Sequence, residues 1–476
     1  MALDKLIKGI QIAAIICNQF GDTGKGKLSD FFSEWADIIA RGTGGNNAGH
    51  TVVVNGKKRI FHLIPAGITY DSAGKINILG NGMVLDLEVL CGELDELTKE
   101  GLSYNNLMIS EDAHVIVPYH VQKDKCKNAS QKDGGIGSTG RGIGPCYEDK
   151  IARAGIMVRD LFDQDTLAKK LKKAAEKYPD VDIEQVMASL KPFAERIKPY
   201  VRDTITEMQK FAAQGKKILL EGAQGLLLSI EFGTYPYVTS SDCSLNGTAS
   251  GVGISAKAVD LPLGIVKFPF MTRVGAGPFP SELGGKQSEE YCAAGLEHNL
   301  EFELKVNGIP YSVSDSGAIK YDRRHPRIIG LMNSLDDFEK GVGIRLAGDE
   351  YGATTGRPRR TGWTDAAAAR YAVGVNGSLM VLTKVDVLGG AREFGVCIGY
   401  NDSAHPSTDF KRDVKFLREA KPIVKHYAGY PDITGETDYS KLPFSLKYAI
   451  EDFEKATGGR AVIVSTGAER GHTIIR

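Results

Sequence analysis

The sequence predicts an α/β fold in which helices flank a large, mostly parallel β-sheet. Short, predominantly apolar runs recur along the chain, at residues 10–17, 217–220, 379–383 and 461–464. Such runs are typical of strands that are buried on both faces. Between them lie segments whose apolar residues repeat at helical spacing. The chain has 476 residues, enough for a large core, so we expect one large domain with inserted subdomains.

Three of the intervening segments carry clear helical patterns. Apolar residues repeat at helical spacing from Leu28 to Ile39 and again from Leu87 to Leu97. The second pattern stops before Gly101, a residue typical of helix C-termini. The segment Leu161–Tyr178 shows a third pattern. We therefore expect helices over all three stretches.

Two Asn-Gly pairs predict β-hairpins. Thr51–Val54 and Arg59–Ile64 flank the first pair, at residues 55–56, and both flanks have strand-like composition. Phe302–Val306 precedes the second pair, at residues 307–308. Asn-Gly is favoured in hairpins because both turn residues need positive φ.

Composition excludes several classes of protein. Lys+Arg and Asp+Glu number 59 each, and a nucleic-acid-binding protein would normally show a basic excess or stripe. The seven cysteines are scattered and never spaced as CxxC, which argues against a disulfide framework and for a reducing compartment. The apolar run at 10–17 follows Lys5 and Lys8 but is too short to span a bilayer and has no cleavage site. We expect a cytoplasmic protein that binds neither nucleic acid nor membrane.

The loop GDTGKGK at residues 21–27 is the most informative motif. It follows a predicted strand and opens a predicted helix, the setting in which glycine-rich turns hold phosphates on backbone N–H groups. Its glycines, Gly21, Gly24 and Gly26, permit close approach of the backbone to a ligand. The loop fits the first part of the P-loop pattern GxxxxGK, which predicts a nucleotide phosphate site.

The residue after this loop departs from the P-loop pattern. A Ser or Thr would place a hydroxyl on Mg²⁺, but the chain has Leu28. The metal then needs another oxygen, and Asp22 within the loop is the obvious source, because a carboxylate is a hard ligand suited to Mg²⁺.

A second small-residue stretch, RGTGGNNAGHT, occupies residues 41–51. So many glycines and amides cannot fill a core, but they can line a pocket where the backbone approaches a ligand. His50 at its end can donate or accept a proton near neutral pH. Taken alone, a single histidine is more often structural than catalytic.

These motifs and those that follow them resemble the adenylosuccinate synthetase family. The resemblance begins with GDTGKGK, GGNNAGHT and HLIPAGI and continues in order along nearly the whole chain: GSTGRGIGPCYEDKIAR (137–153), EGAQG (221–225), GTYPYVTSS (233–241), TRVGAGPFPSEL (272–283), GATTGRPRRTGW (352–363), LTKVDVL (382–388) and STG (465–467). It implies that family's fold, a large, mostly parallel sheet flanked by helices and distantly related to P-loop NTPases, and a homodimer.

The resemblance also implies a reaction. The family joins L-aspartate to IMP with GTP, giving adenylosuccinate, GDP and phosphate through a 6-phosphoryl-IMP intermediate. By carry-over, Asp22 is the base that removes the N1 proton and His50 stabilises charge on O6 and the transferring phosphoryl group. Mg²⁺ is held by Asp22 and the carbonyl of Gly49. The remaining catalytic residues implied are Lys25 and Gln224.

The substrate contacts are implied in the same way. Residues implied to bind GTP are Gly21, Thr23, Gly24, Lys25, Gly26, Lys27, Lys384, Asp386, Ser465 and Gly467, with the Asp386 carboxylate accepting from guanine. Residues implied to bind IMP are Asn47, Thr139, Arg153, Gln224, Thr239 and Arg357, with Arg153 reaching the partner subunit's site. Residues implied to bind aspartate are Thr355, Arg357 and Arg359, since a guanidinium matches a carboxylate in two-point contact.

The chain departs from the family pattern in three places. Thr23 stands where the family loop usually has Glu, Asn46 stands where many members have His, and residues 286–346 contain about fifty extra positions. This insertion is either a surface elaboration or a functional element next to the aspartate loop. Two other functions remain open: a 2-aminoadenylosuccinate synthetase that uses a guanine monophosphate as acceptor, and a GTP-hydrolysing switch protein.

Overall fold

The computed structural model describes residues 2–47, 49–54, 57–130, 139–178, 181–314, 317–352, 356–401 and 406–476. The chain forms two compact units. The N-terminal unit comprises residues 7–17 and 25–263, and the C-terminal unit comprises the chain up to Leu6, residues 18–24 and residues 264–476. The predicted insertion at 286–346 lies within the C-terminal unit.

The N-terminal unit is built on a parallel sheet with the strand order β1-β10-β2-β5-β7-β9. Strands β1, β2 and β10 are mostly apolar and buried throughout, as expected for a sheet covered on both faces. The strands of the unit are β1 (Ile12–Cys17), β2 (Ile38–Arg41), β3 (His50–Val54), β4 (Lys57–Phe61), β5 (Ile76–Leu79), β6 (Val84–Asp86), β7 (Leu107–Ser110), β8 (His114–Ile116), β9 (Val201–Arg202) and β10 (Ile218–Glu221).

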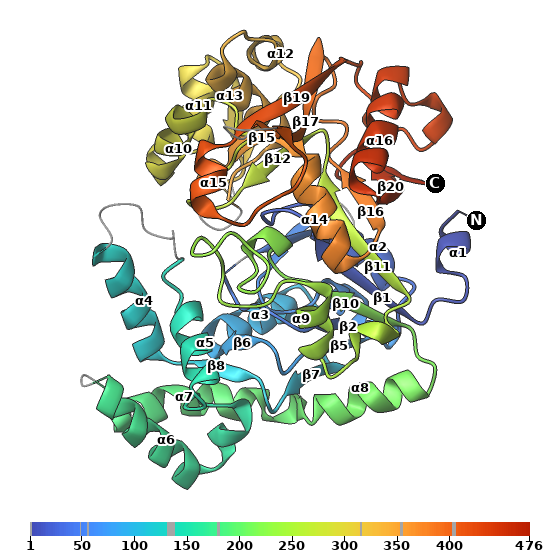
Figure 1. Ribbon diagram of the computed structural model, residues 1–476. Helices are drawn as coiled ribbons and strands as arrows, with labels where there is room; N and C mark the ends of the chain where they lie inside the picture. The colour runs from blue at the N-terminus through green and yellow to red at the C-terminus, as the bar shows by residue number, and fades with distance from the viewer. Residues whose placement is uncertain are drawn as a thin grey trace. The chain divides into compact units, whose positions relative to one another are not determined.

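Helices of this unit cover the sheet and enclose its core. Helix α3 contributes four buried leucines at helical spacing, Leu87, Leu90, Leu94 and Leu97, and Figure 1 draws α8 beside β7. The helices are α2 (Lys25–Ser33), α3 (Leu87–Lys99), α4 (Pro118–Ser130), α5 (Ile143–Ile151), α6 (Gln164–Lys177), α7 (Ile183–Ile197), α8 (Thr204–Ala213) and α9 (Leu245–Ser250); α1 (Ala2–Ile7) precedes β1.

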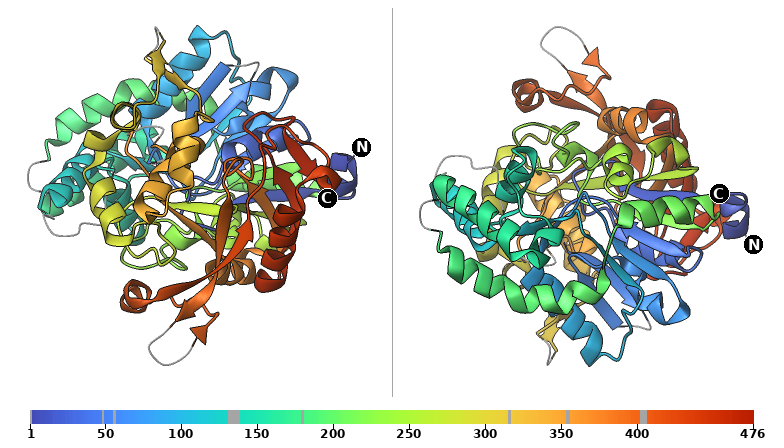
Figure 2. Two further views of the ribbon diagram at one scale, coloured as in Figure 1. Left: turned by 90° about the horizontal axis from the view of Figure 1, so that it is seen from above. Right: turned by 90° about the horizontal axis from the view of Figure 1, so that it is seen from below.

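The C-terminal unit contains further parallel strands and a second, mixed sheet. Strands β11, β16 and β20 pair in parallel, and β21 pairs with β20 in the antiparallel sense. The second sheet has the order β12-β15-β17-β18, with β19 paired to β17. Figure 2 shows β17 and β19 as a long orange and red ribbon. The strands are β11 (Leu261–Lys267), β12 (Phe270–Arg273), β13 (Tyr311–Val313), β14 (Ile319–Tyr321), β15 (Arg360–Asp365), β16 (Leu379–Thr383), β17 (Glu393–Asn401), β18 (Pro406–Ser407), β19 (Lys421–Ala428), β20 (Arg460–Ser465) and β21 (Thr473–Ile475).

One large apolar core runs through this unit and includes Phe268, Phe270, Phe394 and Phe453, all at most 1% exposed. The helices around it are α10 (Gly285–Ala293), α11 (Leu300–Val306), α12 (Pro326–Met332), α13 (Asp337–Gly348), α14 (Ala366–Asn376), α15 (Val414–Glu419) and α16 (Phe444–Thr457). The predicted fold class, a large and mostly parallel sheet flanked by helices, is therefore confirmed.

Most predicted elements are confirmed with shifted ends. Helix α3 is capped by Asp86, which accepts a hydrogen bond from the N–H of Val89, and Gly101 follows it with φ +67°. The third predicted helix begins later than expected, at Gln164, because Asp163 caps α6. Strands β3 and β4 pair as the first Asn-Gly motif predicted, although the turn residues themselves lie outside the described part of the chain.

Two predictions of secondary structure are wrong. The helix expected from Leu28 to Ile39 ends at Ser33, and Ile38–Arg41 forms strand β2 between β10 and β5. Burial on both faces gives β2 an all-apolar start that periodicity alone does not separate from a helix. The hairpin expected around residues 307–308 is also wrong: Phe302–Val306 lies in helix α11, and Asn307 and Gly308 terminate it.

Within the described residues, no helix combines the length and apolar character needed to cross a bilayer.

Candidate active site

The GDTGKGK loop has the strand–loop–helix setting that the sequence predicted. Strand β1 ends at Cys17 and helix α2 begins at Lys25, within the loop itself. Gly21 and Gly24 have φ of +85° and +84°, and Asp22 has φ of +49°. Positive φ is rare for a residue with a side chain and is often found at functional sites. The backbone of the loop therefore turns sharply where the phosphate contacts are expected.

Thr23 lies inside the protein. It is 0% exposed, and its carbonyl accepts a hydrogen bond of 2.8 Å from Oγ1 of Thr383 at the end of β16. Its own Oγ1 has no hydrogen-bond partner among the described residues. The contact with Thr383 fixes the loop to the edge of the strands of the C-terminal unit.

Asp22 pairs with Arg359. The Arg359 Nε and Nη2 atoms each lie 2.6 Å from Asp22 Oδ2, and the two residues are 337 positions apart. Arg359 is largely buried, which by itself lowers its pKa, but the carboxylates of Asp22 and Glu350 raise it overall. The pair joins the expected base to an arginine of the expected aspartate loop, so two motifs of the C-terminal unit meet.

A buried carboxylate that sequence reasoning missed lies next to this pair. Glu350 is 2% exposed and its Oε2 lies 2.5 Å from Nζ of Lys267 and 3.7 Å from Nη1 of Arg359. Its Oε1 lies 3.3 Å from Nζ of Lys384. Burial would raise the pKa of Glu350, but these three cations lower it to about 2. One buried anion thus faces three cations, and the cluster as a whole is cationic.

Lys267 could have been suspected from the sequence. It is the last residue of the apolar strand β11, and polar residues at the carboxyl ends of parallel strands commonly form the ligand site of α/β proteins. Its Nζ also donates to Oγ1 of Thr272 over 2.7 Å. Burial is the main reason that its pKa is lowered, to about 8.

The two motifs expected at the guanine base lie at neighbouring strand ends. Lys384 and Asp386 follow β16, Ser465 ends β20, and these strands pair in parallel. Lys384 has φ of +61°, and its Nζ donates to the carbonyl of Gly348 over 2.6 Å. Asp386 Oδ1 is buried and has no hydrogen-bond partner among the described residues, and such an atom is costly unless a ligand satisfies it.

The residues that follow β16 and end β20 are held by local hydrogen bonds. Ser465 Oγ donates to the carbonyl of Gly467 over 3.2 Å, and the N–H of Val385 donates to the carbonyl of Ser465 over 3.4 Å. The carbonyl of Asp386 accepts from Nη2 of Arg324 over 2.6 Å. Arg324 belongs to the run DRRHPRI of the predicted insertion, so that segment contacts the TKVD motif.

The N-terminal unit brings four of the predicted residues together. Gln224 Nε2 donates to Oδ1 of Asn47 over 2.8 Å, and Asn47 Nδ2 lies 3.5 Å from Oγ1 of Thr239. Lys25 Nζ donates to the carbonyl of Gln224 over 2.5 Å. Gln224 has φ of +44°, a conformation unusual for a side-chain-bearing residue. Lys25, from the phosphate loop, is thereby tied to the residues expected at the monophosphate.

The other predicted site residues are either exposed or outside what the structure describes. Thr139, Arg153 and Arg357 are exposed, and Arg153 has φ of +59° immediately after helix α5. His50 is the first residue of β3, paired with Phe61; its side chain lies outside what the structure describes. Thr355 lies outside the described residues altogether.

Asn46, the second departure from the family pattern, is buried and structural. It is 1% exposed, and its Nδ2 donates to Oδ2 of Asp86 over 2.9 Å. Asp86 also caps α3. The amide therefore fixes the small-residue stretch to the start of a helix.

Among the described residues, no group of three or more His, Cys, Asp or Glu side chains is arranged to hold a metal ion. Mg²⁺ usually keeps several waters and is bound by one or two carboxylates together with substrate phosphates. Of the two ligands that the sequence predicts, Asp22 has a carboxylate, and a carboxylate oxygen is a hard donor of the kind that Mg²⁺ prefers. Residue 28 is an apolar leucine with 1% exposure, and its side chain supplies no oxygen.

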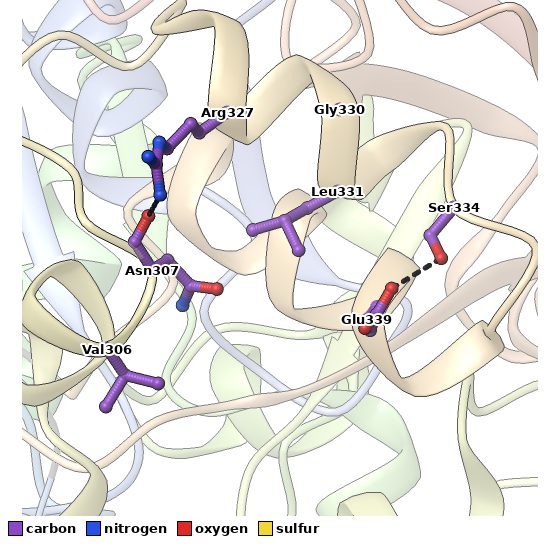
Figure 3. A pocket seen from close by; sticks show the side chains of 7 residues that line it. All are labelled: Val306, Asn307, Arg327, Gly330, Leu331, Ser334 and Glu339. Carbon is purple, nitrogen blue, oxygen red and sulfur yellow. Dashed lines mark hydrogen bonds between the residues drawn. The ribbon is translucent and has the colours of Figure 1, made fainter.

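A hollow of about 440 Å³ lies apart from all these residues. Figure 3 shows its lining, from the end of α11 and from α12 and α13. Arg327 Nη1 donates to the carbonyl of Asn307 over 3.1 Å, and Ser334 Oγ donates to Oε2 of Glu339 over 2.6 Å. Its polar groups thus pair with one another, and no predicted site residue lines it.

Comparison with known proteins agrees with these motifs. The chain matches the family model of adenylosuccinate synthetase over residues 14–474. It is 39% identical to the adenylosuccinate synthetase of Halothermothrix orenii over 474 residues, covering 97% of this chain and 98% of the relative. It is 37% identical to that of Myxococcus xanthus over 480 residues, covering 97% of each.

Two solved structures resemble the fold. A fully ligated adenylosuccinate synthetase from Plasmodium falciparum superimposes with a TM-score of 0.80 at 31% identity, covering 98% of this chain and 100% of that one. A succinoaminodeoxyadenylate synthetase from cyanophage S-2L gives a TM-score of 0.54 at 18% identity, over 98% and 95% of the two chains, and shows the fold alone. The chain belongs to the adenylosuccinate synthetase family and is a ligase.

Proposed function

We propose that this chain ligates L-aspartate to IMP with GTP, giving adenylosuccinate, GDP and phosphate in purine nucleotide biosynthesis. Membership of the family supports this reaction. The observation that carries our assignment of residues is the Asp22–Arg359 pair, which joins the phosphate loop to the aspartate loop within the C-terminal unit.

GTP binding is supported by charge and by unsatisfied polar atoms. The molecule has no net charge, yet Lys267, Lys384 and Arg359 gather around the single carboxylate of Glu350. A local cationic cluster of this kind suits a polyphosphate. The buried Asp386 Oδ1 supplies an acceptor for the N1–H and N2 amine of guanine, a pair of donors that adenine does not offer in that arrangement.

The IMP contacts draw on the amide network of the N-terminal unit. Asn47, Gln224 and Thr239 already hydrogen-bond to one another, so their side chains are oriented before a ligand arrives. Pre-orientation reduces the entropy lost on binding. We assign these three residues to the nucleoside monophosphate, together with Thr139, Arg357 and, from the partner subunit of a homodimer, Arg153.

The chemistry begins at the purine. Asp22 takes the N1 proton of IMP, which leaves negative charge on O6. That oxygen attacks the γ-phosphorus of GTP, and GDP departs, giving 6-phosphoryl-IMP. The amine of aspartate then attacks C6, and the C6–O6 bond breaks as phosphate leaves. His50 donates a hydrogen bond toward O6 and the transferred phosphoryl group, and each such contribution is typically worth about 10²–10⁴-fold in rate.

The remaining residues orient the reactants. Arg359 pairs with Asp22 and, together with Thr355 and Arg357, donates hydrogen bonds to the carboxylates of aspartate. Lys25 and the loop amides from Gly21 to Lys27 contact the phosphates. Asp22 and the carbonyl of Gly49 would hold Mg²⁺, which would neutralise phosphate charge when bound. We place the enzyme in the cytoplasm as a homodimer.

A single assay tests the assignment. The protein is incubated with GTP, Mg²⁺, aspartate and either IMP or GMP, and product is followed by ultraviolet absorbance. We expect GTP turnover only when both aspartate and IMP are present. Turnover with GMP would favour a 2-aminoadenylosuccinate synthetase, and turnover without aspartate would favour a hydrolytic switch.

The base is tested with Asp22→Asn. This change keeps the size of the side chain and removes its ability to accept a proton as a carboxylate. We expect product formation to fall at least about 10²-fold, in line with the loss of a general base, while circular dichroism stays unchanged. A variant that keeps its activity would remove Asp22 from this role.

A further inference from the structure

Segment 286–346 buries a charged side chain where a surface elaboration would not need one. Glu303 lies on helix α11, which Asn299 caps, and its side chain is 0% exposed. Glutamate is almost never fully buried unless it is paired. The position of this carboxylate therefore points to a specific set of partners.

Those partners are an arginine and a tyrosine. Arg345, on helix α13, places Nε 3.0 Å from Glu303 Oε1 and 3.1 Å from Oε2, and Nη2 donates to Oε1 over 2.6 Å. Tyr351 donates its hydroxyl to Oε2 over 2.5 Å. Such two-point pairing fixes direction as well as distance. Both oxygens of Glu303 are thus engaged.

The network leads from Glu303 to the arginine that holds the expected base. Arg345 Nη1 donates to the carbonyl of Arg359 over 3.0 Å. Arg359 Nη1 in turn donates to the carbonyl of Tyr351, and the N–H of Arg359 donates to the carbonyl of Glu350 over 3.0 Å. Arg359 is therefore held through its backbone and its side chain by groups that Glu303 orients.

The same contacts close the base of the loop that carries Arg357 and Arg359. Tyr351 and Pro358 form an antiparallel bridge, and the N–H of Gly352 donates to the carbonyl of Arg357 over 2.8 Å. Tyr351 forms one side of this narrow ladder, and its hydroxyl donates a hydrogen bond to Glu303. The Glu303 carboxylate thus contacts one of the two strands of the ladder directly, through Tyr351, and the other through Arg345.

We infer that segment 286–346 acts as a brace for the aspartate loop, with Glu303 as its positioning residue for Arg359. The inference rests on the proposed function, because it assigns Arg359 to aspartate and to Asp22. A buried ion pair is often no more stabilising than apolar residues of similar volume. Here the ion pair orients its neighbours: it fixes the positions of the Arg359 carbonyl and the Tyr351 hydroxyl. Small misplacements at a reacting site can cost about 10²-fold in rate.

The test is Glu303→Gln in the full-length protein, assayed with GTP, Mg²⁺, IMP and varied aspartate. The control is Glu301→Gln on the same helix, whose side chain is 43% exposed and pairs with Lys305. We expect kcat/KM for aspartate to fall about tenfold or more in Glu303→Gln, with the KM for IMP changed less than about twofold. The control should match the wild type.

A second variant covers the case in which Glu303→Gln does not fold. Tyr351→Phe removes one hydrogen bond without leaving a buried charge unpaired, and we expect a fall of about threefold to tenfold in kcat/KM for aspartate. An unchanged kcat/KM in a folded variant overturns the inference. A uniform loss for all three substrates, in proportion to the fraction unfolded, also overturns it. Wild-type dependence on both IMP and aspartate is measured first, so failure of the proposed function is recognised separately.

Discussion

Glu350→Gln gives the sharpest test of the buried charge cluster. The substitution keeps the shape of the side chain and removes the buried negative charge that Lys267, Lys384 and Arg359 share. The pKa of Glu350 is lowered from 4.5 to about 2. At about 1.4 kcal/mol per unit, this difference corresponds to about 3 kcal/mol of stability at neutral pH.

The buried ion pair between Glu350 and Lys267 leads to a loss of similar size. Removing one partner of a buried ion pair typically costs about 3–5 kcal/mol, because the other charge stays buried without compensation. Lys267 would be that charge, since it is 0% exposed. With a urea dependence of about 3 kcal/mol per M, we expect the unfolding midpoint of the C-terminal unit to fall by about 1 M.

Fluorescence can follow that unit alone. The chain has two tryptophans, Trp35 in the N-terminal unit and Trp363 in the C-terminal unit. In a Trp35→Phe background, the buried Trp363 on β15 reports the transition. Glu451→Gln, at an exposed position of α16, is the matched control.

The stability that Glu350 contributes should depend on pH in one direction. The folded pKa of Glu350 lies below its unfolded value, so its contribution is fully present above about pH 4.5 and is lost as the pH falls toward 2. The gap between wild type and Glu350→Gln should therefore be constant from about pH 5 to 7 and shrink below that range. A midpoint shift at pH 7 no larger than that of Glu451→Gln would refute the reasoning.

Two further predictions concern substrate choice and assembly. Asp386→Asn should reduce the preference for GTP over ATP by about 10-fold or more, because a neutral amide cannot accept both guanine donors; equal preference in the variant and the wild type, measured as the ratio of kcat/KM, would contradict the assignment. Arg153→Ala and Asp22→Asn should each be inactive, yet mixing them should restore part of the activity if Arg153 acts across a homodimer. Mixtures that stay inactive at every ratio would exclude this shared site.

Some features could be predicted because they depend on local sequence. The apolar runs of β1, β10, β16 and β20 were found because strands buried on both faces need continuous apolar residues. The GDTGKGK turn was found because its glycines supply the positive φ of Gly21 and Gly24. The prediction of a helix as far as Ile39 was wrong, because a short buried strand such as Ile38–Arg41 and a buried helix can have the same composition.

Where a local sequence pattern is compatible with two structures, tertiary contacts decide which one forms. Asn307-Gly308 is typical of a hairpin turn, but a glycine with positive φ is also typical of a helix end. Here Gly308, with φ of +60°, follows the end of α11, and Asn307 has φ of −87°. Segment 286–346 could be located in the sequence because it is longer than the family pattern, but its role could not be predicted. Its buried carboxylate, Glu303, pairs with Arg345, which lies 42 positions away. No periodic sequence pattern links two residues at that separation.

The sequence by itself determined the fold class, the family and the identity of most candidate residues, because motifs and apolar periodicity are encoded locally. Tertiary structure alone decided which charges meet. Asp22 and Arg359 pair across 337 positions, and Glu350 gathers cations from three separate segments. The strength of a buried charge depends on its distance from other charges and on exclusion of water, and both are set only when the chain has folded.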